Sequence, residues 1–242
     1  MQKNNQRIDD LGLDGLKIVQ NVDGYGFTSD SVLLANFVKT KRQDLCVEIG
    51  AGSGVISILV AHKEKPQKII AFEIQKKVAE LANQNVLLNG MEKQIQIANN
   101  KIQNFKQYVD VGSVDVVFSN PPYFKFDKKV CGENDERVIS RFDKELSISD
   151  LFATASKMLK FGGKMFFVHS AERVAECFDA MQENNIAPKR IYFVHPNQRK
   201  NASVFLCEGV KGGKSSVIVM PPLFTNDLDG NYIQTIQKLY KK

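Results

Sequence analysis

The sequence lacks the patterns that mark secreted, membrane-spanning or metal-binding proteins. Its four cysteines are scattered without CxxC spacing and predict neither a disulfide framework nor a zinc site. The three histidines show no metal-ligand spacing either. No apolar run approaches the roughly 20 residues that span a bilayer, and the polar start of the chain does not resemble a signal peptide. We therefore expect a cytoplasmic protein with no membrane segment and no bound metal.

The composition is typical of a globular protein with a sizeable core. The chain has 242 residues, of which 43% are hydrophobic and 25% charged. No internal repeat, linker or low-complexity tract divides it, so we expect a single domain over residues 1–242. Residues 1–25 would form an N-terminal extension and residues 187–242 a basic C-terminal hairpin and tail. The net charge of +6 suits a polyanionic partner.

A glycine-rich turn follows the first buried strand that the sequence predicts, residues 45–49. The turn contains Gly50, Gly52 and Gly54, and Glu48 precedes it. Glycines permit a tight turn and let a ligand approach the backbone. The spacing is not the G-x-G-x-x-G of dinucleotide sites, and no Gly-Lys-Ser/Thr follows, so neither a nicotinamide site nor a phosphate-binding P-loop is predicted. A turn of this kind without a ligand is the alternative.

A second expected strand, residues 68–72, ends at the carboxylate of Glu73. This residue lies 19 positions after Gly54. A carboxylate about 20 residues beyond the glycines is the expected acceptor for a ribose hydroxyl, whereas a solvated strand-end carboxylate or helix cap is the alternative. A helix over residues 76–89 and strands over residues 95–98 and 115–118 are expected to follow.

The fourth strand leads into Asn120, Pro121, Pro122 and Tyr123. Two prolines exclude a regular helix or central strand, so we expect a rigid loop just past a strand end, where open α/β sheets place ligands. The Asn120 amide oxygen and the Pro121 carbonyl can each accept one hydrogen of an amino group. Tyr123 can stack on a base. An ordinary Asn-Pro turn is the alternative.

The remaining segments complete the expected architecture. Alternation near residues 16–20 suggests a small hairpin or edge strands. A helix over residues 149–160, closed by Gly162-Gly163, would precede a strand over residues 164–169 and another helix over residues 172–184. Residues 190–195 and 203–208 are expected to pair as an antiparallel hairpin.

The stretch from residue 189 to residue 214 carries most of the chain's net positive charge. It has one acidic residue, Glu208, and six basic ones: Lys189, Arg190, Arg199, Lys200, Lys211 and Lys214. This stretch is a candidate patch for an RNA backbone. For any single lysine, a solvated side chain is the alternative.

These motifs resemble those of a known enzyme family. Asn-Pro-Pro-Tyr is similar to the signature of methyltransferases that use S-adenosylmethionine and modify an exocyclic amino nitrogen, and the glycine turn after Glu48 resembles their first motif. The order of elements resembles a class I methyltransferase, a Rossmann-like α/β fold with a doubly wound, mostly parallel seven-stranded sheet and a C-terminal antiparallel hairpin. Four stretches together resemble the bacterial tRNA adenine-N6 methyltransferases that act on valine tRNA: residues 26–30, 48–54, 119–123 and 195–202.

The resemblance implies S-adenosylmethionine as the cofactor and valine tRNA as the partner, with the methyl group placed on N6 of the adenine at position 37, beside the anticodon. It implies four catalytic residues: Asn120, Pro121, Pro122 and Tyr123. It implies a cofactor site made of Thr28, Asp30, Glu48, Gly50, Ala51, Gly52, Gly54, Glu73, Ile74, Asn100 and Asn120.

Two parts of this expected site carry alternatives. Thr28 and Asp30 would close over the methionine end of the cofactor, or they simply begin a capped helix. Lys101 stands where the family usually has an aspartate that accepts a hydrogen bond from the cofactor adenine. An ammonium group cannot accept that bond, so Asn99, Asn100 or the backbone would have to replace it.

Other functions remain open from the sequence. A protein glutamine-N5 methyltransferase of the release-factor type is one alternative, because the side-chain amide nitrogen of glutamine also suits Asn-Pro-Pro-Tyr. Another RNA or DNA base-amino methyltransferase would suit it as well. A non-catalytic binding module is the third possibility, although the complete glycine turn and Asn120 argue against it.

Overall fold

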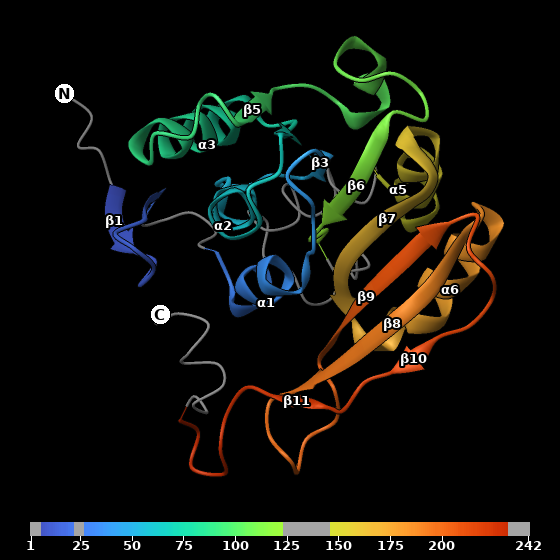
Figure 1. Cartoon of the computed structure of the whole chain (residues 1–242). Coiled ribbons are helices and arrows are strands. Elements are labelled where there is room, and N and C mark those ends of the chain that lie inside the picture. The colour runs from blue at the N-terminus through green and yellow to red at the C-terminus, as the bar shows by residue number, and fades with distance from the viewer. Residues whose placement is uncertain (1–5, 22–26, 123–145, 232–242) are drawn as a thin grey trace, which may run out of the picture.

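A mixed sheet forms the centre of the computed structural model, which describes residues 6–21, 27–122 and 146–231. Its strands run in the order β10-β8-β9-β7-β6-β3-β4-β5, and β11 pairs with β8 (Figure 1). The strands are β3 (Leu45–Ile49), β4 (Lys68–Phe72), β5 (Ile95–Ala98), β6 (Val114–Ser119), β7 (Leu159–Ser170), β8 (Ile186–His195), β9 (Val204–Lys211), β10 (Ile218–Val219) and β11 (Leu223–Phe224). The helices are α1 (Ser29–Phe37), α2 (Val55–Glu64), α3 (Lys76–Leu88), α5 (Ile148–Met158) and α6 (Val174–Glu183), with short 3-10 helices η1 (Ile102–Gln107) and η2 (Ala171–Arg173).

The sheet is doubly wound around β3. Parallel strands β4 and β5 extend it to one side, and parallel strands β6 and β7 extend it to the other. Beyond β7, the antiparallel pair β9 and β8 closes the sheet. The predicted fold class is therefore confirmed, and the two-residue strands β10 and β11 add to the seven predicted strands by pairing in parallel with β8. The order of the strands reverses between β3 and β6, which is where sheets of this kind bind ligands.

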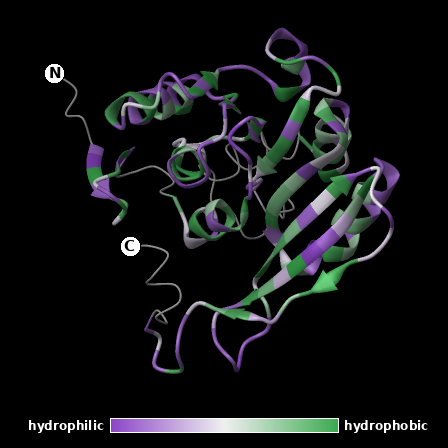
Figure 2. Ribbon diagram, in the orientation of Figure 1, coloured by the Kyte–Doolittle hydropathy of each residue, from purple (hydrophilic) through white to green (hydrophobic). Residues whose placement is uncertain are grey.

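Two hydrophobic cores lie on the two faces of this sheet, because alternate residues of each strand point to opposite sides. On β6, Val116 and Phe118 join the core beneath α1 and α2, whereas Val117 joins the core beneath α5 and α6. Burial on both faces explains why β3, β4 and β6 are apolar almost throughout. Hydrophilic bands become frequent on β8 and β9 in Figure 2, near the outer edge of the sheet.

A separate hairpin of β1 (Gln6–Asp10) and β2 (Lys17–Asn21) lies at the N-terminus, as predicted. Two asparagines four residues apart hold it, Asn85 in α3 and Asn89 at the C-cap of that helix. Asn85 Oδ1 accepts a hydrogen bond from the Val19 amide (2.7 Å), and its Nδ2 donates to Val19 O (3.1 Å) and to Ser53 O (3.0 Å). Asn89 makes the matching pair of bonds with the backbone of Lys17 (3.0 and 2.8 Å). Each side-chain amide therefore binds both the N–H and the C=O of one β2 residue, as the backbone of a neighbouring strand would do.

The expected helix end at Gly162-Gly163 is wrong. Helix α5 ends at Met158, and Leu159 begins β7 by pairing with Val114 of β6. The register of this pair shifts before Lys164, and Gly162, with φ of 78°, lies within the irregular part. The two glycines therefore belong to an irregularity in a strand and not to a helix terminus.

We expect Asn85→Ala to lower the free energy of unfolding by about 2–4 kcal/mol, because it removes three hydrogen bonds and leaves buried backbone groups without partners. Asn89→Ala is the matched control. It releases the same hairpin at a more exposed position, so we expect a loss of about 1 kcal/mol. Urea denaturation of both variants gives the two values. An equal loss in the two would contradict a special role of Asn85.

Candidate active site

The residues of the candidate site come together because four neighbouring strands end in register. One row of paired residues crosses β6, β3, β4 and β5, in the order Ser119, Ile49, Phe72 and Ala98. The strands are parallel, so the residue after each of these lies at the same carboxyl edge of the sheet. Those residues are Asn120, Gly50, Glu73 and Asn99. The sequence-predicted residues of three separate motifs thus meet along one edge.

The glycine turn opens toward a space that no described residue fills. Gly50 and Gly52 have φ angles of 79° and 54°, which favour glycine, and a Cβ built on either would meet no atom of the described residues within 4 Å. The turn is fixed from behind, because the amides of Gly50 and Ala51 both donate to Phe72 O (3.0 and 2.8 Å). Gly54 packs against Ala82 of α3, to which a Cβ on it would come within 3.5 Å. The backbone therefore lines a space that a bound molecule can approach closely.

Glu73 ties the end of β4 to this turn. Its Oε2 accepts from the Gly52 amide (3.0 Å), and its Oε1 accepts from the Gln75 amide (2.9 Å). Burial raises the pKa of the Glu73 carboxyl, and these backbone hydrogen bonds lower it in part. Each carboxylate oxygen has two lone pairs, so accepting capacity is left for ligand hydroxyls. The next residue, Ile74, is half-buried.

Glu48 lies wholly buried behind the glycine turn. Its Oε2 accepts a hydrogen bond from the Ser57 hydroxyl of α2. Within the described residues, its Oε1 has no hydrogen-bond partner. Burial raises the pKa of Glu48 to about 8, although hydrogen bonds from Ser57 lower it, and the nearby Glu73 raises it further. A buried oxygen without a partner is uncommon, and this one marks a polar position that a water or a ligand group would satisfy.

Asn99 and Asn100 at the end of β5 are both engaged in local hydrogen bonds. Asn99 Nδ2 donates to the carbonyls of Glu73 (2.9 Å) and Ile74 (3.1 Å). Asn100 Oδ1 accepts from the Lys101 amide (2.9 Å) and from Asn104 Nδ2 (2.8 Å). Both lone pairs of the Asn100 carbonyl are therefore in use. Its predicted hydrogen bond to the cofactor adenine would require one of these partners to be released.

Asn120 is held from the neighbouring helix α1. Its Nδ2 donates to the Ser31 hydroxyl at 3.1 Å, across 89 residues of sequence. The Ser119 hydroxyl donates to Ile49 O (2.8 Å) and so fixes the end of β6 to β3. Pro121 is half-buried and Pro122 exposed, whereas Tyr123 lies outside the described residues.

Helix α1 begins beside Asn120. Thr28 is the N-cap residue of this helix, yet its side chain makes no capping hydrogen bond within the described part of the chain. Asp30 is half-buried in the first turn, and its Oδ1 lies 3.4 Å from the Ser29 hydroxyl. The sequence pointed to Thr28 and Asp30 but not to Ser31, whose partner is remote. Asn85, which reaches Ser53 O in the glycine turn, was missed for the same reason.

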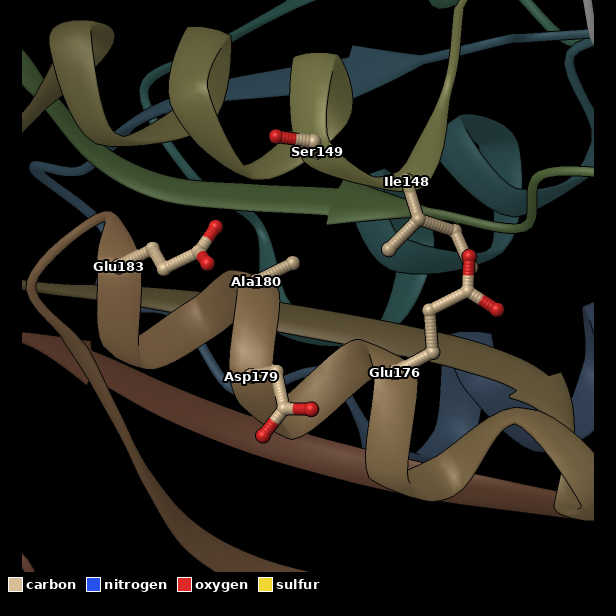
Figure 3. A pocket seen from close by; sticks show the side chains of 6 residues that line it. All are labelled: Ile148, Ser149, Glu176, Asp179, Ala180 and Glu183. Carbon is tan, nitrogen blue, oxygen red and sulfur yellow. The ribbon is translucent and has the colours of Figure 1, made fainter.

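A separate hollow lies between α5 and α6. Figure 3 shows Glu176, Asp179 and Glu183 projecting from α6, with Ile148 and Ser149 at the facing end of α5. Three carboxylates make this surface unfavourable for a nucleic-acid backbone. Over the described residues, no group of three or more His, Cys, Asp or Glu side chains is placed to hold a metal ion. Among the helices of the described residues, none has the length and apolar character needed to cross a membrane.

Comparison with known proteins places these features in context. The family model described as "Methyltransferase small domain" matches residues 26–184. A relative from Dyadobacter fermentans, named tRNA1(Val) (adenine(37)-N6)-methyltransferase, is 26% identical over 205 residues, which cover 84% of this chain and 82% of the relative.

Solved structures share the fold. A predicted O-methyltransferase from Agrobacterium tumefaciens superimposes with a TM-score of 0.70 at 20% identity, covering 87% of this chain and 95% of that protein. TYW2 of M. jannaschii, solved in complex with AdoMet, gives a TM-score of 0.58 at 13% identity and covers 87% of this chain and 89% of that protein.

The raised pKa of Glu48 predicts a pH dependence of stability. Between about 4.5, the ordinary value, and about 8, the native protein keeps a proton that the unfolded chain loses. The free energy of unfolding therefore falls as pH rises through this interval. Glu48→Gln removes this titration while leaving Glu73 in place. From about pH 5.5 to about pH 8, we expect wild type to lose roughly 2–4 kcal/mol relative to the variant in urea denaturation. Parallel pH profiles would contradict the assignment.

Proposed function

Because the chain belongs to the methyltransferase small-domain family, we propose that it transfers a methyl group from S-adenosylmethionine to N6 of an adenine in tRNA. The observation that carries this proposal is the Asn-Pro-Pro segment at the carboxyl end of β6, directly beside the glycine turn that follows β3. The finer assignment, adenine 37 of valine tRNA, is supported by the printed name of the relative from Dyadobacter fermentans.

The reaction loop would act by hydrogen bonding and positioning. An exocyclic amino group is a poor nucleophile, because its lone pair is delocalised into the ring. Asn120 Oδ1 and the Pro121 carbonyl would each accept one of its hydrogens, which favours tetrahedral geometry at nitrogen and exposes the lone pair. Pro122 would keep the loop rigid, and Tyr123 would stack on the base. Because the leaving group is already good, no strong base is required, and orientation supplies most of the rate.

The glycine turn and the strand ends beside it would hold the cofactor. S-adenosylmethionine supplies an activated methyl group on a sulfonium when it is bound. Three features of the described part of the chain support such a ligand: the open space at Gly50 and Gly52, the accepting capacity of Glu73, and the Oε1 of Glu48, which has no partner there. The residues that we propose for this site are Thr28, Asp30, Glu48, Gly50, Ala51, Gly52, Gly54, Glu73, Ile74, Asn100 and Asn120.

The candidate RNA patch is smaller than the charge count suggests. Lys211 Nζ donates to the carbonyls of Ser156 and Leu159 near the end of α5. Arg190 forms an ion pair with Glu208, and its guanidinium lies 5.3 Å from the centre of the Phe37 ring. These two cations therefore stabilise the fold. Of the six basic residues, Arg199, Lys200 and Lys214 have exposed side chains.

The turn between β8 and β9 is the best-placed basic element. Strand β8 runs parallel to β7 and β6, so its carboxyl end lies on the same side of the sheet as Asn120. Local hydrogen bonds hold the turn: Asn197 Oδ1 accepts from the Arg199 amide (2.9 Å), Asn197 O accepts from the Lys200 amide (3.2 Å), and His195 Nδ1 lies 2.9 Å from Lys200 O. We propose that Arg199 and Lys200 contact the phosphates of the bound tRNA.

Transfer of labelled methyl groups from S-adenosylmethionine to total tRNA, taken from cells that lack the gene, tests the function. We expect N6-methyladenosine in a valine tRNA after nucleoside analysis. Label in another base or another tRNA would keep the chemistry and overturn the finer assignment. Label in protein and none in RNA would overturn the RNA substrate and point to the glutamine reaction.

In the same assay, we expect Asn120→Ala to lower kcat by roughly a hundred-fold, because a preorganised polar group in an active site contributes on that order. Calorimetric affinity for S-adenosylmethionine should stay nearly unchanged, since the backbone of the glycine turn is intact. Full turnover in the variant would exclude Asn120 from the reaction.

Replacement of Arg199 and Lys200 by glutamine is expected to weaken tRNA binding and to reduce the slope of log K against log salt by about one unit per lost phosphate contact. Lys93→Gln with Lys157→Gln is the matched control, because it removes two exposed charges at the opposite edge of the sheet. Filter binding at several salt concentrations measures both. Equal slopes in the two double variants would remove the turn from the interface.

A further inference from the structure

The hydrogen bond between Ser31 and Asn120 joins a helix to the proposed reaction loop. Ser31 is 6% exposed, and its hydroxyl oxygen accepts from Asn120 Nδ2 at 3.1 Å. An asparagine amide carries its donor and its acceptor on the two branches of one planar group. With Nδ2 directed at Ser31, Oδ1 is turned toward the other side.

We propose that Ser31 is a positioning residue that sets the orientation of the Asn120 amide, so that its oxygen and not its NH2 group meets the amino nitrogen of the substrate. This inference rests on the proposed function of Asn120. An amide rotated by half a turn would place NH2 against NH2, which offers no acceptor for an amino hydrogen. An aspartate would need no such partner, because its two oxygens are equivalent.

Both ends of the bond are held by rigid parts of the fold. The Ser31 amide donates to Thr28 O (3.1 Å), and the apolar residues that follow Ser31 in α1 are buried in the core that this helix shares with α2 and β7. At the Asn120 end of the bond, the Ser119 hydroxyl ties the end of β6 to Ile49 O. Because both elements are fixed, the two side chains lose little conformational freedom when they form this hydrogen bond, so the bond can select one amide orientation.

A cycle of variants separates orientation from simple packing. We expect Ser31→Ala to lower kcat about ten-fold, the factor to which one hydrogen bond corresponds, with the KM for S-adenosylmethionine unchanged. Ser31→Thr keeps the hydroxyl and should retain most of the rate. In the Asn120→Asp background, Ser31→Ala should have little effect, because a carboxylate presents an acceptor in either orientation. An unchanged kcat in Ser31→Ala, an equal loss in Ser31→Ala and Ser31→Thr, or an equal loss in both backgrounds would overturn the proposal.

A measurement without substrate keeps this test independent of the proposed function. The side-chain NH2 resonances of Asn120, assigned in isotope-labelled protein by comparison with Asn120→Asp, report its hydrogen bonding directly. We expect a shift of these resonances in Ser31→Ala and near-wild-type positions in Ser31→Thr. Unchanged resonances in Ser31→Ala would overturn the bond itself, whereas a shift without methyl transfer to RNA would overturn the substrate and leave the orientation of Asn120 in place.

Discussion

The site depends on one constraint, the in-register parallel pairing of β4, β3 and β6. Ile49 pairs with Phe72 on one side and with Ser119 on the other. A strand rises about 3.3 Å per residue and alternates its faces. A slip of one residue in the pairing of β6 with β3 would displace Asn120 by that distance and send its strand's side chains to the wrong core. The two cores oppose such a slip because each requires alternate residues of the same strands.

Periodicity could predict most of the elements, because buried parallel strands are apolar throughout and covering helices repeat their apolar residues every three to four positions. The end of α5 could not be predicted in this way. Gly162 and Gly163 carry a local signal for a helix terminus, but the pairing of Leu159 with Val114 extends β7 back past both. Long-range pairing overrode a local preference. Strands β10 and β11 have two residues each, too few to show any period, and only their pairing with β8 defines them.

For the candidate site, spaced motifs in the sequence could indicate the proposed functional residues more readily than the side chains that contact them. Gly52 and Glu73 belong to spaced motifs, whereas Ser31 and Asn85 find their partners 89 and 32 residues away without any local pattern. Counting charges in the sequence likewise does not reveal which side chains have remote partners. It cannot distinguish Lys211, whose ammonium group donates to two carbonyls beside α5, from the exposed cations of the turn between β8 and β9.

An asparagine in the reaction loop has a requirement that an aspartate lacks, because only one branch of its amide can accept a hydrogen bond. In this chain the other branch is held by Ser31 of α1, and Phe27, which lies just before α1, contacts the N-terminal hairpin. The Phe27 amide donates to Gln20 Oε1 of β2 at 2.7 Å, and Asn85 and Asn89 hold β2 against α3. A continuous set of contacts therefore runs from α3 through the N-terminal hairpin to α1 and Asn120. We therefore expect β2 to support the start of α1, and through Ser31 the proposed reaction loop, in addition to the core that α1 shares with α2 and β7.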